Sequence, residues 1–310
     1  MAHESQLLDI AQARRCPVCN TSRESATLFL TKNIDQKKIT NFSFSSRKEP
    51  EFMRHQLLRC TTCDLVYVDQ PPPADALANA YHHAEYDSSE EARDAAKAYI
   101  SAIQPTLNAL KQHNDALEIG AGTGVFLEQL ADQGFVNLIG IEPSAAAIAA
   151  ASEKTRAWLR EGIFSEADYQ SNSFDLICCF MTMEHVPDPT IIASACHRLL
   201  RPGGVFVTVT HDYRGAVNRL LGRRSPIIDI EHMQLFSPTS IKQLFERTGF
   251  SDVTVNTFVN AYALRYWLRL MPLPRLVKRI LGSCIAIAQL DKIKFSINVG
   301  NLITTGIKQK

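Results

Sequence analysis

Two cysteine pairs of identical spacing lie in the first part of the sequence, Cys16-Pro-Val-Cys19 and Cys60-Thr-Thr-Cys63. Each pair forms a turn that can direct two thiolates at one point, and four thiolates are the ligands that structural zinc prefers. We therefore predict a tetrahedral zinc site, and because four protein ligands leave no open position, the metal would be structural rather than catalytic. A redox-active or simply buried dithiol is the alternative. The remaining cysteines lie in apolar contexts and are expected in the core: Cys178, Cys179, Cys196 and Cys284.

A glycine-rich loop, Gly120-Ala121-Gly122-Thr123-Gly124, lies between an apolar run typical of a strand and the start of a helical pattern. Glycines allow a tight turn and the close approach of a ligand. The third glycine follows the second too closely for the dinucleotide-binding fingerprint. Glu118, at the end of the strand, would repel a pyrophosphate but attract a cationic group, and Glu142 ends the next predicted strand, where a carboxylate can accept both ribose hydroxyls. The loop thus favours a cationic adenosine derivative.

Five motifs, in this order, resemble those of the class I S-adenosylmethionine-dependent methyltransferases. They are the glycine loop, Glu142-Pro143-Ser144, Phe174-Asp175-Leu176-Ile177, Glu184-His185-Val186-Pro187-Asp188-Pro189 and Leu200-Arg201-Pro202-Gly203-Gly204. The resemblance covers roughly residues 95–310. It implies S-adenosylmethionine as cofactor, with Glu142 at the ribose and Ile163 and Phe164 beside the adenine. The cofactor site that it implies comprises Glu118, Gly120, Ala121, Gly122, Gly124, Glu142, Pro143, Ile163, Phe164, Phe180, Met181 and Tyr86.

Strands and helices alternate along most of the chain, which predicts an α/β fold with right-handed crossovers. Strands are expected at 116–119, 137–141, 174–180, 205–210, 250–258 and 301–307, and helices at 125–133, 145–152, 191–200 and 238–248. With the resemblance, this is a Rossmann-like, doubly wound sheet, mostly parallel with an antiparallel last strand. We expect a zinc-ribbon module over 1–73, a helical cap over 74–113 and the methyltransferase domain over 114–310, with substrate-side insertions at 212–236 and 261–295.

Candidate catalytic groups follow the fourth and fifth predicted strands, because ligands of open α/β sheets bind beyond the carboxyl ends of the strands. Transfer to oxygen requires the acceptor to lose its proton, and a histidine with a pKa near neutrality suits that role. His211 is the first candidate, followed by His185, Glu231 and His232. Each candidate also has a non-catalytic interpretation. His211 could be a surface histidine in a loop, and His185 could serve only to pack its loop. The segment 214–236, which contains Glu231 and His232, could be a solvated helix and turn.

Charge and hydropathy narrow the possible partners. The 33 basic and 32 acidic residues give a net charge of +1, so no overall field attracts DNA or an anionic membrane. Residues 20–55 contain no dense basic stripe, which disfavours RNA. Residues 1–15 lack the apolar core of a secretory signal, and no apolar stretch reaches the roughly 18 residues of a membrane span. We expect a cytoplasmic protein.

The segment 261–295 is locally basic, with seven Lys and Arg residues against one Asp. Such a basic amphipathic insertion could rest on an anionic membrane or receive a lipid-linked acceptor. It could equally be a substrate cap or a dimer surface, which is the more modest interpretation and the one favoured from sequence.

The sequence therefore predicts a methyltransferase of small molecules, most simply one that methylates a hydroxyl of a sugar, glycan precursor or natural product. The cysteine module resembles those of bacterial methyltransferases in glycan and natural-product pathways. Two other enzymatic hypotheses are RNA methylation, with the zinc ribbon recognising the substrate, and carbon methylation of a nucleotide-sugar. A non-catalytic zinc-ribbon binding protein on a degenerate methyltransferase scaffold is a fourth, which the intact glycine loop and Glu142 disfavour. The sequence does not identify the acceptor or the oligomeric state.

Overall fold

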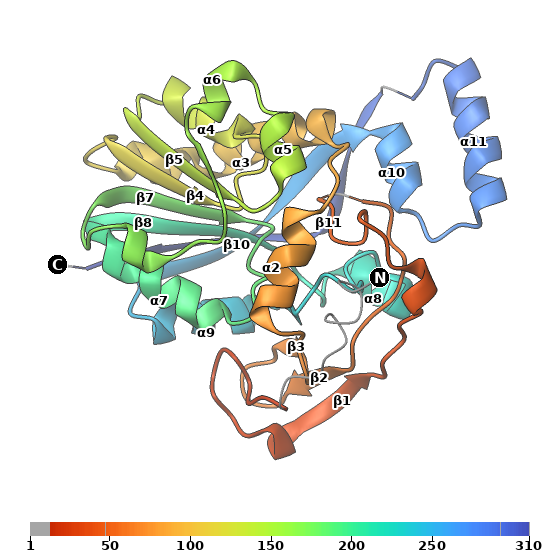
Figure 1. Ribbon diagram of the computed structural model, residues 1–310, viewed down its shortest axis with the longest axis horizontal. Helices are drawn as coiled ribbons and strands as arrows, with labels where there is room; N and C mark the ends of the chain where they lie inside the picture. The colour runs from red at the N-terminus through yellow and green to blue at the C-terminus, as the bar shows by residue number, and fades with distance from the viewer. Residues whose placement is uncertain (1–12, 47, 292, 310) are drawn as a thin grey trace.

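The computed structural model describes residues 13–46, 48–291 and 293–309 and contains two β-sheets that share one body (Figure 1). A seven-stranded sheet with helices on both faces forms the larger part. A four-stranded sheet, built mainly from the N-terminal region, packs beside it.

The large sheet has the strand order β10-β11-β8-β7-β4-β5-β6. Its strands are β4 (Asp115–Ile119), β5 (Asn137–Glu142), β6 (Leu159–Glu161), β7 (Phe174–Phe180), β8 (Leu200–His211), β10 (Ser251–Ala263) and β11 (Lys294–Ile307). Strands β6, β5, β4, β7 and β8 pair in parallel, whereas β11 runs antiparallel to both β8 and β10. The predicted Rossmann-like, mostly parallel sheet is confirmed.

Two helical layers cover this sheet. The layer of α3 (Ser89–Ala109) and α4 (Val125–Asp132) packs on one face, and that of α7 (Pro189–Leu199) and α9 (Pro238–Arg247) packs on the other (Figure 1). Ser237 caps α9 in a reciprocal capping box with Ser240, as the Ser-Pro start of the helix predicts. The other helices are α2 (Ala74–His82), α5 (Ala145–Ala149), α6 (Glu153–Arg156), α8 (Ala216–Leu221), α10 (Leu264–Leu270) and α11 (Arg275–Ile287), with 3₁₀ turns η1 (Arg23–Ser25), η2 (Gln36–Lys38), η3 (Glu166–Asp168) and η4 (Gly222–Arg224).

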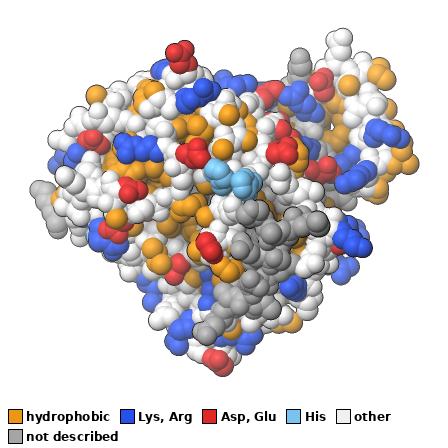
Figure 2. Space-filling view, in the orientation of Figure 1, with side chains coloured by type: hydrophobic (Ala, Val, Ile, Leu, Met, Phe, Trp, Pro, Cys, Tyr) orange, Lys and Arg blue, Asp and Glu red, His pale blue; other side chains and the backbone are white. Residues whose placement is uncertain are grey.

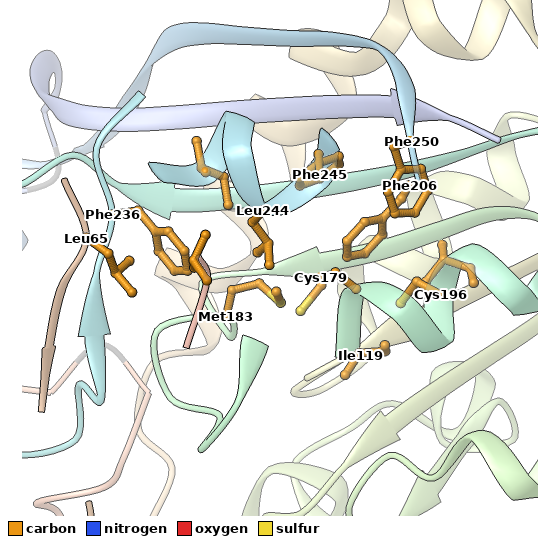
Figure 3. Close-up of a cluster of buried hydrophobic side chains, with 14 of the residues drawn as sticks. Leu65, Ile119, Cys179, Met183, Cys196, Phe206, Phe236, Leu244, Phe245 and Phe250 are labelled. Carbon is orange, nitrogen blue, oxygen red and sulfur yellow. The ribbon is translucent and has the colours of Figure 1, made fainter. Parts of the chain in front are cut away.

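The small sheet is antiparallel, with the order β1-β2-β3-β9. It consists of β1 (Ala26–Leu30), β2 (Leu57–Cys60), β3 (Val66–Val68) and β9 (Gln234–Leu235). Strand β9 comes from the predicted insertion 212–236, so distant parts of the chain complete this sheet. One apolar cluster runs from Leu65 and Phe236 to Phe206 and Phe250 of the large domain (Figure 3). The cysteine module and the large domain therefore share a core.

Several boundaries differ from those predicted. Strands β10 and β11 are longer than expected and form an extended hairpin whose far end carries α10 and α11. The strand expected at 205–210 begins earlier, so the motif Leu200-Arg201-Pro202-Gly203-Gly204 lies within β8, where Gly203 adopts a φ of 85°. Residues 74–113 form two helices separated by the connection that contains Tyr86. In the described part of the chain, no helix is long and apolar enough to cross a membrane.

Candidate active site

A cavity of about 660 Å³ lies beyond the carboxyl ends of the parallel strands. The glycine loop after β4 forms one wall. The N-terminal module, the 212–236 segment and the β10–β11 hairpin contribute the others. This is the position at which open α/β sheets bind ligands.

The glycine loop needs its glycines for two different reasons. Gly120 and Gly122 both have positive φ values, of 79° and 55°, which side chains rarely adopt. A Cβ atom at Gly120 would lie 2.1 Å from Thr182 Oγ1, so that glycine allows close packing. A Cβ at Gly122 would meet nothing within 4 Å, so Gly122 borders open space inside the cavity. The open space beside Gly122 is where a ligand can approach the backbone.

Glu142, at the end of β5, ties this loop in place. Its Oε2 accepts a hydrogen bond of 2.7 Å from the Gly122 amide, and its Oε1 accepts one of 2.8 Å from the Ser144 amide. Burial raises the pKa of the Glu142 carboxyl, while the two amides act in the opposite direction. The carboxylate also lines the cavity and can accept further hydrogen bonds.

The residues predicted to contact the cofactor lie around this cavity, with one exception. Those that line it are Glu118, Gly120, Ala121, Gly122, Glu142, Pro143, Ile163, Phe164, Phe180, Met181 and Tyr86. Gly124 is not among the lining residues. It precedes α4 with a φ of 72°, and a Cβ there would lie 3.0 Å from the Thr155 Cβ. Gly124 therefore shapes the turn into the helix.

Three histidines from separate segments come together in the wall of the cavity. His185 follows β7, His211 ends β8 and His232 precedes β9. The ring centroids of His185 and His232 are 4.7 Å apart, and those of His211 and His232 are 6.0 Å apart. The Tyr81 hydroxyl lies 2.9 Å from His185 Nδ1 and donates to the Glu231 carbonyl.

These imidazoles are neutral at physiological pH. Burial lowers the pKa of His185 and of His211 to about 4, and that of His232 well below its ordinary value. The near-neutral pKa expected from sequence is therefore wrong, because the fold removes these rings from water. The Nδ1 of His232 donates to the Ile227 carbonyl at 2.7 Å, and that of His211 donates to Asn301 Oδ1 at 3.0 Å. Both rings consequently keep Nε2 as a proton acceptor.

Comparison with known proteins assigns the family. A family profile described as a methyltransferase domain matches residues 90–255, more than half of the chain. The chain belongs to the class I S-adenosylmethionine-dependent methyltransferases. It is an enzyme of that class, and the resemblance predicted from its motifs is confirmed.

The curated relatives include ubiquinone biosynthesis O-methyltransferases. The one from Psychrobacter cryohalolentis is 32% identical over 190 residues, covering 56% of this chain and 73% of the relative. The one from Methylococcus capsulatus is also 32% identical, over 115 residues, covering 34% of this chain and 48% of the relative. The chain thus spans about half the length of the latter. A solved Thermotoga maritima methyltransferase, titled a possible histamine N-methyltransferase, has 21% identity and a TM-score of 0.47, with 70% of this chain and 91% of that chain covered.

The four cysteines predicted as metal ligands lie together in this methyltransferase. The Sγ atoms of Cys16, Cys19, Cys60 and Cys63 are all within 4.8 Å of one another, and all four side chains are buried. Cys178, Cys179 and Cys196 are buried as expected. The prediction for Cys284 is wrong: it is exposed on α11, because that helix projects from the body instead of joining the core.

Sequence reasoning missed a buried ionic cluster in the cavity wall. Lys48 Nζ lies 3.0 Å from Asp229 Oδ2 and 2.6 Å from Glu231 Oε2, and it also pairs with Glu51. Burial raises the pKa of Asp229 to about 6 and that of Glu231 to about 8. Burial alone would lower the pKa of Lys48, but the three carboxylates hold it above its ordinary value. The carboxylates lie close enough to share a metal ion, but the Lys48 ammonium already contacts all three.

The segment 214–236 is not the solvated helix and turn considered from sequence. After a short helix, residues 227–236 are buried and bring Glu231 and His232 to the cavity. Three aromatic residues also line the cavity, Tyr262 from β10 and Tyr266 and Trp267 from α10. All three lie within the segment 261–295 that was expected as a substrate-side insertion, although they were not predicted individually as site residues.

Proposed function

We propose that this enzyme methylates a hydroxyl of a small molecule bound in the cavity. The observation that carries the proposal is the pair of neutral imidazoles, His211 and His232, each with Nε2 left as a proton acceptor in the same cavity as the glycine loop. The curated relatives named above are O-methyltransferases, which supports transfer to oxygen.

The cofactor would lie along the glycine loop. The open space beside Gly122 and the carboxylate of Glu142 at its edge fit an adenosine, with Glu142 accepting from the ribose hydroxyls. Glu118 would attract the positive charge of the methionine part, and Ile163 with Phe164 would flank the adenine. When bound, S-adenosylmethionine supplies an electrophilic methyl group on a sulfonium.

On the acceptor side, we assign the general base to His211. Asn301 Oδ1 fixes its Nδ1–H, so Nε2 is directed to take the hydroxyl proton as the oxygen attacks the methyl group. His232 stands beside it as a second acceptor. Holding the hydroxyl in line with the methyl group would account for much of the remaining rate enhancement.

The acceptor itself is proposed to combine polar groups with an apolar surface. Tyr262, Tyr266 and Trp267 offer aromatic faces. Asn260 Oδ1 is buried at the cavity and has no hydrogen-bond partner among the described residues, so it can accept from an acceptor hydroxyl. A hydroxylated ring, as in a sugar or an aromatic natural product, would use both features. The segments 212–236 and 261–295 would then act as the substrate-side insertions.

The N-terminal cysteines are proposed to hold a structural zinc ion. Zn–S bonds of about 2.3 Å in a tetrahedral site put sulfur atoms about 3.8 Å apart. The Sγ–Sγ distances of 3.4 Å for Cys16 with Cys63 and for Cys19 with Cys60 need only a slight expansion to meet this geometry.

The experiment that tests the proposed activity supplies isotope-labelled S-adenosylmethionine and the enzyme to a bacterial extract separated into metabolite, lipid, protein and RNA fractions. Label in the metabolite or lipid fraction that His211→Ala greatly reduces would support the proposal. Glu142→Ala, which should lose cofactor binding, serves as the background control. Label confined to RNA or protein, or undiminished in His211→Ala, would overturn it.

A further inference from the structure

The helix α11 is amphipathic with its apolar side facing outward. Leu276, Ile280 and Ile287 recur at helical spacing on one face and are 58%, 54% and 84% exposed. All 13 residues of α11 are at least partly exposed. In Figure 1 the helix stands away from the large sheet at the end of the β10–β11 hairpin. The described residues therefore leave the apolar face of α11 uncovered.

The opposite face of α11 makes its contacts with the protein. Gly282 lies against α10, where a Cβ would be 3.8 Å from Leu268 Cδ2. Lys278 Nζ donates to the Arg269 carbonyl and pairs with Glu49 at 2.6 Å. A surface helix normally buries its apolar side against the core. The orientation of α11 is the reverse, and these contacts hold its apolar face toward the outside.

The apolar surface continues beyond the helix. Four apolar residues between the end of α11 and the first part of β11 are each about 40% exposed: Leu290, Ile293, Phe295 and Ile297. We call these four residues, with the outward face of α11 (Leu276, Val277, Ile280, Leu281, Cys284 and Ile287), the hairpin surface. Figure 2 shows apolar and basic side chains side by side on this projecting lobe. Contiguous apolar surface of this kind usually marks an interaction site.

The charge of α11 and its flanking residues indicates which kind of partner the hairpin surface binds. Residues 271–290 contain no Asp or Glu, and besides Lys278, which pairs with Glu49, they contain Arg275 and Arg279. A short helix with an apolar face and a basic edge fits the interface of an anionic bilayer, in which the apolar side enters the acyl region and the basic groups meet lipid phosphates. A second copy of this chain fits less well, because a helix about 20 Å long offers far less than the roughly 800 Å² per partner typical of a stable interface.

We propose that the hairpin surface docks the enzyme on an anionic lipid bilayer. The helix would lie in the plane of the interface with Ile280 and Ile287 inserted and with Arg275 and Arg279 at the phosphates. Leu270, Met271 and Pro272, which lead into α11, also line the cavity. Docking therefore holds one side of the cavity at the membrane, and if the proposed function holds, it favours an amphiphilic acceptor.

The test is co-sedimentation of the full-length enzyme with vesicles of phosphatidylcholine alone or mixed with phosphatidylglycerol. We expect binding to the mixed vesicles that added salt weakens. Arg275→Ser with Arg279→Ser should reduce the partition coefficient by roughly 30-fold, at about fivefold for each basic residue. Ile280→Asp should reduce it at least tenfold. Val136→Asp, which changes a still more exposed apolar residue between α4 and β5, should have no effect.

Vesicle binding needs no turnover, so failure of docking is distinguishable from failure of the proposed activity. Circular dichroism of each variant checks that it folds. Absence of binding, or equal binding to both kinds of vesicle, would overturn the proposal. So would a dimer in sedimentation velocity that Ile280→Asp dissociates, because the hairpin surface would then be a contact between copies.

Discussion

At the scale of single residues, the three cavity histidines illustrate how far burial can lower the pKa of an imidazole. His211 ends a strand in a position that sequence reasoning could locate. Its pKa could not be foreseen, because desolvation depends on the Asn301 strand and on the His232 segment that cover it. A base of low pKa is weaker, but it is available over the whole physiological range.

His211→Ala should lower kcat by about 10²- to 10⁴-fold, since it removes the proposed proton acceptor while leaving the glycine loop intact. In the unmodified enzyme, kcat/KM should stay level as pH falls from 7 to about 5 and should decline only near pH 4, where His211 takes up a proton. A pH–rate profile measured with dialysed enzyme checks this. A decline centred near pH 6.5 would contradict it.

The variant Asn301→Asp should change the pKa of His211 in the opposite direction to burial. A carboxylate beside the Nδ1–H of His211 favours the imidazolium, so the pKa of His211 should rise. The acid limb of the pH–rate profile should therefore move to higher pH. An unmoved limb would mean that a group other than His211 controls the rate, and circular dichroism across the same pH range excludes unfolding as the cause.

Substitution of Lys48 tests how much the buried ionic cluster contributes to the stability of the fold. Lys48→Met removes the only ammonium that contacts Glu51, Asp229 and Glu231 in the described structure, and it leaves three carboxylates with no positive partner there. Breaking a buried ion pair in this way should lower the free energy of unfolding by about 3 to 5 kcal/mol. Urea denaturation measures the change. Lys242→Met, at an exposed helical pair with Glu246, should change it by less than about 1 kcal/mol.

At the scale of secondary-structure elements, prediction succeeded where a pattern was strong and local. Strand β7 was predicted at its observed bounds because its seven residues are all buried and, apart from Asp175, are all apolar. The three-residue strand β6 and the two-residue β9 carry no such pattern, since pairing with a distant neighbour defines them. The outer ends of β10 and β11 were missed for the same reason: they are stabilised by each other.

The two cysteine turns are elements whose stability should depend on metal. If the four thiolates hold zinc, removing it with a strong chelator should lower Tm by several degrees, because metal-binding free energy contributes to folding free energy. Cys63→Ser should have a similar effect and should reduce bound zinc measured by atomic absorption. Cys284→Ser, at an exposed cysteine outside the cluster, is the matched control. Full retention of Tm after complete zinc removal would contradict a structural role.

At the scale of the whole molecule, the cysteine module and the catalytic domain are joined more closely than their positions in sequence suggest. Strand β3 pairs with β9, and Arg14 donates from its guanidinium to the carbonyls of Val68, Pro187 and Met233. A domain boundary was predicted at residue 73, because the run Pro71-Pro72-Pro73 is typical of a stiff linker. Side-chain packing across that boundary could not be read from local patterns.

A shared core should unfold as one unit. Leu65 is fully buried in the apolar cluster that extends to Phe206 and Phe250 (Figure 3). Leu65→Ala should therefore lower stability by about 2 to 5 kcal/mol and shift a single transition, whether it is followed by zinc release or by the far-ultraviolet signal of the large sheet. Leu28→Ala, at a largely exposed position of β1, should have little effect. If zinc release and unfolding of the large sheet occurred in separate transitions in Leu65→Ala, the cysteine module would instead be an independent unit. Its residues at the cavity, including Lys48, could then move without unfolding of the catalytic domain.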